Sequence, residues 1–157
     1  MDVRVESHVE DLIKAKDNAI ERALEKIGLQ CEGYAIELCP VDTGLLRNSL
    51  THAVGGSSPS VSSYKQNATH AATPATERAG TAGKATDGRE GTYSGTVGSK
   101  GDECVYIGTN VEYAKYVEFG HKSPSGKQVP AQPFLRPAVQ NHLDEYKRIA
   151  ESELRHA

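Results

Sequence analysis

Residues 9–39 repeat apolar side chains at steps of three and four, which is the period of a long amphipathic helix. Pro40 ends this helix, because the residue before a proline is pushed out of the α region. At about 1.5 Å per residue the helix is about 45 Å long. Either one end overhangs the sheet on which it lies, or the surplus length contacts a neighbouring chain. Gly28 lies inside the helix, where glycine costs about 1 kcal/mol relative to alanine, and it permits a kink there.

Residues 55–101 have a different composition from the rest of the chain. Val61 and Val97 are their only Val, Ile, Leu or Phe residues, and Gly, Ser, Thr and Ala fill 30 of their 47 positions. Such a segment buries too little apolar surface to offset its ordering entropy. The sequence therefore predicts a long, flexible hairpin or flap that leaves the sheet after Val54 and returns near Tyr93.

The remaining segments carry ordinary helix and strand signals. Residues 51–54 and 103–108 are typical of strands, residues 111–119 of a short helix capped by Asn110, and the chain after Pro137 of a final helix. This order predicts an α+β fold, in which the long N-terminal helix and the C-terminal helix pack on a small, mainly antiparallel sheet. We expect residues 1–157 to form a single domain that carries the flap at 55–101.

The charge balance bears on possible partners. The chain has 18 basic and 21 acidic residues, a net charge of −3 with histidine neutral. No cationic surplus is available to hold phosphate backbones, so we expect no specific binding to DNA. No apolar run approaches the length of about 20 residues that spans a membrane, so we expect no membrane partner.

The nucleophilic and metal-ligating residues do not form a known catalytic, cofactor-binding or metal-binding motif. The sequence has no G-x-S-x-G elbow and no H-x-x-x-H pair, and its three cysteines show no C-x-x-C spacing. We therefore predict no catalytic residue, no cofactor and no metal ligand, and we do not expect an enzyme. The six histidines are interpreted as surface or incidental residues.

Aromatic residues gather in one short stretch. Tyr106, Tyr113, Tyr116 and Phe119 lie close together in the sequence. A strand and a helix that give their aromatic residues to the core would produce this pattern. A protein–protein contact would produce it too, since tyrosine is enriched at such interfaces.

Three segments in this order resemble a known family: 41–50 (VDTGLLRNSL), 105–120 (VYIGTNVEYAKYVEFG) and 130–138 (PAQPFLRPA). They resemble the head–tail connector family of tailed double-stranded DNA phages, which includes proteins similar to the lambda minor tail protein Z and is described as neck, tail-completion or tail-component proteins. The resemblance covers nearly the whole chain outside the flap. The family usually has a shorter connection between the first two segments, and a threonine is common at the position that His121 occupies here.

The resemblance implies a structural virion protein of the phage neck or tail, assembled in the cytoplasm of the bacterial host. Such a protein forms a homomeric ring, 6- or 12-fold, that joins the head to the tail and lets DNA pass. Its partners are copies of itself and the adjacent head-completion and tail-terminator or tail-tube proteins. The alternative is a tail-terminator or tube-capping subunit. We take five residues as candidate inter-subunit contacts: Tyr93, Tyr113, Tyr116, Glu118 and His121.

Overall fold

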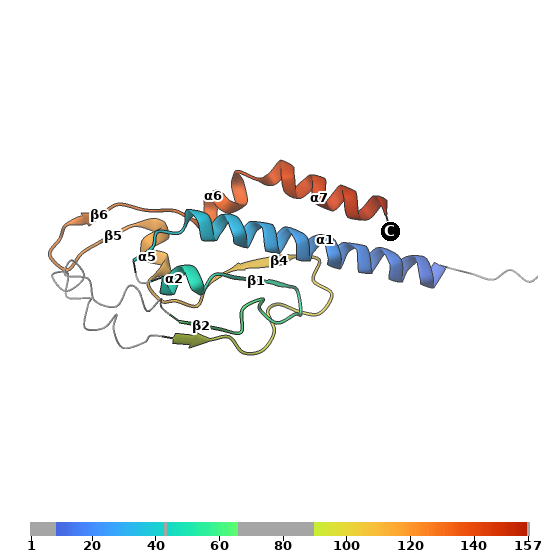
Figure 1. The fold of residues 1–157 in the computed structure, drawn as a ribbon, viewed down its shortest axis with the longest axis horizontal. Helices are drawn as coiled ribbons and strands as arrows, with labels where there is room; N and C mark the ends of the chain where they lie inside the picture. The colour runs from blue at the N-terminus through green and yellow to red at the C-terminus, as the bar shows by residue number, and fades with distance from the viewer. Residues whose placement is uncertain (1–8, 43, 66–89, 157) are drawn as a thin grey trace, which may run out of the picture.

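The computed structural model describes residues 9–42, 44–65 and 90–156. In chain order its elements are α1 (Val9–Leu38), α2 (Leu45–Asn48), β1 (Thr51–Val54), β2 (Ser63–Lys65), β3 (Glu90–Thr92), β4 (Val105–Gly108), α5 (Ala114–Phe119), β5 (His121–Lys122), β6 (Gln128–Val129), α6 (Leu135–Gln140) and α7 (Leu143–Arg155). Helix α1 runs along the molecule and packs against α6 and α7 as well as against β1 and β4 (Figure 1). This arrangement confirms the α+β fold.

Helix α1 presents small residues to the rest of the protein. Its buried positions are Ala19, Ala23, Gly28, Cys31 and Ala35. The helix passes through Gly28 without interruption, so the glycine does not end or divide it. A Cβ atom at Gly28 would lie 2.4 Å from the His52 ring and 2.8 Å from the Val105 side chain. Glycine is therefore needed here because β1 and β4 lie directly against the helix.

The strands form three separate antiparallel pairs among the described residues, rather than one sheet. β1 pairs with β4, β2 with β3, and β5 with β6. In the first pair Thr51 lies opposite Gly108 and Val54 opposite Val105. All four residues of β1 are buried. The pair β1–β4 is thus the inner one, and the other two pairs lie outside it.

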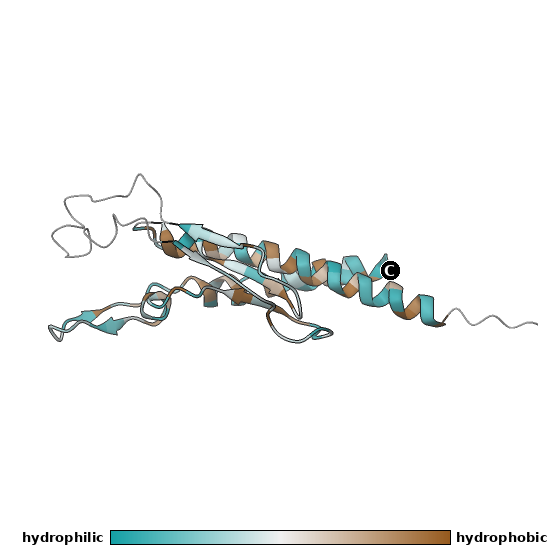
Figure 2. Cartoon of the chain, turned by 90° about the horizontal axis from the view of Figure 1, so that it is seen from below, coloured by the Kyte–Doolittle hydropathy of each residue, from teal (hydrophilic) through white to brown (hydrophobic). Residues whose placement is uncertain are grey.

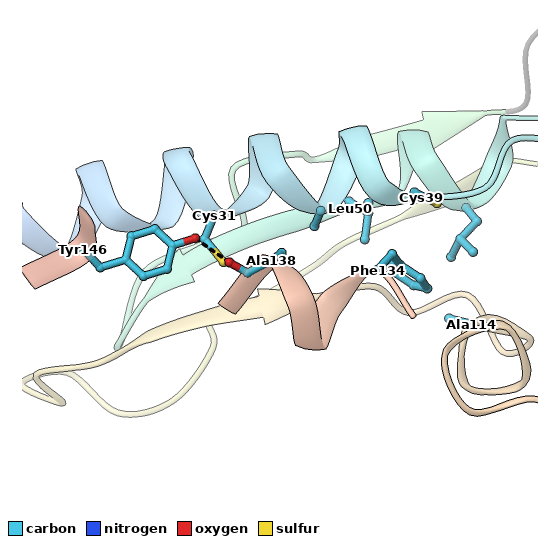
Figure 3. Close-up of a cluster of buried hydrophobic side chains, with 9 residues drawn as sticks. Cys31, Cys39, Leu50, Ala114, Phe134, Ala138 and Tyr146 are labelled. Atoms are coloured by element: carbon cyan, nitrogen blue, oxygen red, sulfur yellow. Dashed lines mark hydrogen bonds between the residues drawn. The ribbon is translucent and has the colours of Figure 1, made fainter. Parts of the chain in front are cut away.

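The core lies where α1, α2, α5, α6 and α7 meet (Figure 3). Phe134 is completely buried, and Leu50 is nearly so. Tyr146 of α7 is buried as well, and its hydroxyl donates to the carbonyl oxygen of Ala138 at 2.7 Å. Burial raises the pKa of the Cys39 thiol to about 11, so this thiol is protonated at neutral pH. The core therefore holds its polar groups either hydrogen-bonded or neutral.

The C-terminal segment forms two helices instead of the single one predicted. α6 ends at Gln140, and α7 begins at Leu143. Between them the His142 ring stacks on the ring of Tyr34 of α1, with centroids 3.5 Å apart. The Tyr34 hydroxyl donates to Glu145 at 2.6 Å, and at the other end of α7 Glu153 pairs with Arg22 and Lys26. These contacts with α1 set the direction of α7 and explain why α6 does not simply continue.

The described start of the predicted flap is bonded to the body. Ser60 donates from its backbone N–H to the carbonyl oxygen of His52, and the Asn48 side chain donates to the carbonyl oxygen of Lys65. Strands β2 and β3 then form the hairpin that the sequence predicted, and the returning strand β3 ends at Thr92, next to Tyr93. The centre of the flap, residues 66–89, lies outside the described residues.

Two further local predictions are wrong. Helix α5 begins at Ala114, not at Val111, and Asn110 does not cap it. The Asn110 side chain instead donates to the carbonyl oxygen of Thr92 and accepts a hydrogen bond from Tyr64. Strand β4 begins at Val105 rather than at residue 103. In the first case a long-range contact with the β2–β3 hairpin has displaced the local capping interaction.

The close approach at Gly28 can be tested with a matched pair of substitutions. Gly28→Ala should lower the free energy of unfolding by about 1–3 kcal/mol, because the added methyl group meets His52 and Val105. Gly33 lies on the exposed face of the same helix with no atom within 4 Å of an added Cβ. Gly33→Ala should therefore stabilise the protein by up to about 1 kcal/mol. Urea unfolding of both variants measures this, and equal effects would refute the explanation.

Candidate functional site

Tyr116 and His121 are brought together at one end of the molecule. Tyr116 is 47% exposed on α5, and its ring lies 5.4 Å from the ring of His121, the first residue of β5. The Lys115 ammonium group lies 5.1 Å from the centre of the Tyr116 ring. The hairpin β5–β6, which the sequence analysis did not predict, projects from this end (Figure 1). The two predicted residues therefore belong to one aromatic and basic surface.

Glu118, unlike Tyr116, is buried, and its carboxylate is hydrogen-bonded within the chain. Its side chain is only 5% exposed. The carboxylate accepts hydrogen bonds from the backbone N–H groups of Phe134, Leu135 and Arg136 at 2.8–3.1 Å, and the Arg136 guanidinium donates to it as well. Burial by itself would raise the pKa of Glu118, but these hydrogen bonds outweigh it and lower the pKa. Glu118 thus joins α5 to the beginning of α6, and its carboxylate does not lie on the surface.

Tyr93 and Tyr113 also make contacts within the chain. The Tyr93 hydroxyl donates to the carbonyl oxygen of Ser49 and accepts from the backbone N–H of Asn110 at 3.2 Å. Tyr113 precedes α5 and packs, partly buried, against the core cluster. Of the five predicted contact residues, Tyr116 is the one with the most clearly exposed side chain.

Large apolar side chains are exposed at both ends of the molecule. At one end these are Val9, Leu12 and Ile13 of α1, which are 57%, 69% and 53% exposed. At the other end Phe119 is 65% exposed, beside Tyr116. Figure 2 shows hydrophobic residues continuing along α1 toward its first turn, past the end of α7. One end of the long helix therefore extends beyond α7, which is one of the two arrangements that its length predicted.

A buried histidine is the site that sequence reasoning missed. His52 of β1 is 2% exposed, and its Nδ1 lies 2.6 Å from a carboxylate oxygen of Glu32. Its Nε2 lies 3.2 Å from Glu25, and the Ser60 hydroxyl donates to Glu32 at 2.7 Å. Glu25 and Glu32 are seven residues apart on α1, so they lie on one helical face on either side of Gly28. That spacing is visible in the sequence, but the strand that it faces is not.

The hydrogen bond between His52 and Glu32 alters the pKa of both groups. It raises the pKa of His52, and the burial that opposes this is the smaller effect. Burial of Glu32 would raise the pKa of its carboxyl, but hydrogen bonds from His52 and Ser60 outweigh it and lower that pKa. The charged pair is therefore the favoured state. Among the described residues it fastens β1 to α1.

Two other features are absent from the part of the chain that the structure describes. The described residues contain no cluster of three or more His, Cys, Asp or Glu residues that could hold a metal ion. They also contain no helix that is long and apolar enough to cross a membrane.

Residues 4–120 match the model of one protein family, described as "Bacteriophage HK97-gp10, putative tail-component". The match covers most of the chain, so the protein belongs to this family of tailed-phage structural proteins. No curated protein and no solved structure gives a significant match. Membership implies a place in the virion, and it supports the tailed-phage part of the resemblance while leaving the neck itself to be tested.

The role of Glu118 predicts a specific loss of stability. Glu118→Gln should lower the free energy of unfolding by about 1–3 kcal/mol, because one of the oxygens that accept from the start of α6 is replaced by an NH₂ group. Glu112 is exposed at the surface nearby. Glu112→Gln should therefore leave the free energy of unfolding within about 0.5 kcal/mol of wild type. Denaturant titrations of the two variants make the comparison, and equal midpoints would contradict the assigned role.

The His52–Glu32 pair predicts a pH dependence. Because the pKa of His52 is raised on folding, its contribution to stability is complete below about pH 6.5, the ordinary histidine value, and is lost as the pH rises through the raised pKa. The melting temperature should therefore fall as the pH rises above this value. His52→Gln should flatten this slope, whereas His156→Gln, at an exposed position, should leave it unchanged. Calorimetry at pH values below and above about 6.5 measures the melting temperature of each protein. If His52→Gln has the same slope of melting temperature against pH as wild type, the pair does not cause the pH dependence.

Proposed function

We propose that this protein is a structural subunit of the phage neck, and that it forms a homomeric ring that joins the head to the tail. The observation that carries the proposal is the exposed apolar surface at both ends of an elongated subunit that belongs to a tail-component family. Most of the Leu12 side chain and most of the Phe119 side chain are exposed to solvent. A ring subunit has its surfaces completed by neighbouring copies, which accounts for both patches.

Two different patches at opposite ends favour a ring over a two-fold dimer. A two-fold dimer joins the same surface of both copies, whereas a head-to-tail contact joins one surface to another and closes into a ring when the rotation permits. The interior of such a ring is a passage for DNA. The net charge of −3 per subunit would multiply in the ring and weakly repel phosphates, so DNA would slide through without specific binding.

The tail tube offers the second candidate. The family description names the tail, so a ring that terminates the tail tube would also account for the match. The same surfaces would serve there, since a terminator also contacts copies of itself and the end of the tube. The two candidates differ in the layer that the ring occupies and in what happens when it is missing.

A nonsense mutation in the gene, within the phage that carries it, separates these functions. For a neck protein we expect filled heads and complete tails of normal length that remain unjoined, and a plasmid copy of the gene should restore infectious particles. For a tail terminator the tails themselves would have abnormal lengths. Electron cryomicroscopy of wild-type particles should show this chain as a closed ring between head and tail. Normal, infectious particles without the protein would refute both candidates.

A further inference from the structure

We infer that residues 9–18 of α1 in one copy dock on the α5 and β5–β6 end of the next copy. This inference rests on the proposed ring, and it names the two surfaces that meet. The occupant is a second copy of this chain. Below, residues 9–18 are called the overhang, and the surface formed by Tyr116, Phe119, Lys115 and Lys122 is called the aromatic end.

The overhang continues the packing face of α1 beyond the body of the protein. Every residue from 9 to 18 is exposed, and the first buried position is Ala19. Val9, Leu12 and Ile13 follow the spacing that carries Ala19, Ala23 and the next buried residues along the helix, so they lie on the same face.

Helix α7 ends before it reaches the overhang. Glu153, near the C-terminal end of α7, pairs with Arg22 and Lys26 of α1. Val9 lies about 20 Å further along the helix at about 1.5 Å per residue. Figure 1 shows α1 extending well past the C-terminal end of α7. Leu154, also near the end of α7, is 46% exposed next to this gap in coverage. The face that α7 covers in one half of α1 therefore lies open in the other half.

The aromatic end carries exposed aromatic side chains against which the apolar residues of the overhang can pack. Tyr116 and Phe119 project from α5, and Arg136 lies 5.0 Å from the centre of the Phe119 ring, which holds that side chain in place. Exposed aromatic side chains of this kind supply much of the binding energy at protein interfaces. Figures 1 and 2 place this end of the molecule opposite the overhang. Opposite placement is what a head-to-tail contact requires.

Charge supports the same pairing. From Ala114 to Val129 the basic residues are Lys115, Lys122 and Lys127, and the single acidic residue, Glu118, is buried beneath the backbone of α6. On the overhang, the three acidic residues outnumber the two basic ones, Lys14 and Lys16. Glu10 and Asp17 lie three residues before and four residues after Ile13, so they border the apolar stripe. Docking would bring carboxylates to a surface of lysines. The charges favour this orientation, because two aromatic ends, each with exposed lysines and no exposed carboxylate between Ala114 and Val129, would repel each other.

Cysteine cross-linking tests which surfaces meet. The starting protein is the full chain with Cys104→Ser, since Cys31 and Cys39 are buried. Leu12→Cys and Phe119→Cys are introduced separately and together, and a short bismaleimide is added to concentrated protein. Both positions are exposed, so melting temperatures should stay close to wild type. Leu29 is 64% exposed on another face of α1, and Leu29→Cys with Phe119→Cys is the matched control.

We expect a ladder of covalent oligomers from the Leu12→Cys/Phe119→Cys variant that ends at the number of subunits in the ring. A mixture of the two single variants should give dimers alone, and each single variant and the Leu29 control should give none. Dimers from Leu12→Cys by itself would show a two-fold contact and overturn the inference. If particles contain the ring but the double variant gives no ladder, the inference fails while the proposed function stands. If particles contain no ring of this chain, the proposed function fails.

Discussion

The close contact between α1 and β1 is the constraint on which the rest of the structure depends. It occurs where Gly28 leaves room for the ring of His52, and the pair of carboxylates from Glu25 and Glu32 holds that ring from both sides. A larger residue at 28 would push β1 and β4 away from the helix. The small residues along the same face, Ala23 among them, serve the same purpose. The backbone of α1 therefore lies close against side chains of β1 and β4, and this close packing adds to the core around Phe134.

A second contact joins the two segments on either side of the β5–β6 hairpin. Glu118 links the segment 105–120 to the segment 130–138. The Glu118 carboxylate accepts hydrogen bonds from the backbone N–H groups at the start of α6. The β5–β6 hairpin lies between these segments in the sequence. It is therefore held at its base by a buried, charge-assisted set of hydrogen bonds. A rigid base of this kind lets a projecting hairpin keep a defined direction at an interface.

Sequence reasoning was most accurate where local periodicity decides the structure, and least accurate where distant segments meet. The spacing of apolar residues predicted α1 and its overhang, because both follow from 3.6 residues per turn and from length. The predicted start of α5 was wrong, because the Asn110 side chain bonds to the β2–β3 hairpin and does not cap α5. Glu118 was expected at the surface, and nothing local links it to Phe134. His52 looked incidental because its partners lie on another element.

The distribution of apolar residues separates folding from assembly in this chain. The buried face of α1 is built from alanine, glycine and cysteine. Leucine, isoleucine and phenylalanine side chains are instead exposed at the two ends of the molecule. The body can therefore fold through contacts that no neighbour supplies. The ends hold apolar surface that gains free energy only when another molecule covers it. In the ring that we propose, neighbouring copies of the chain would supply this cover.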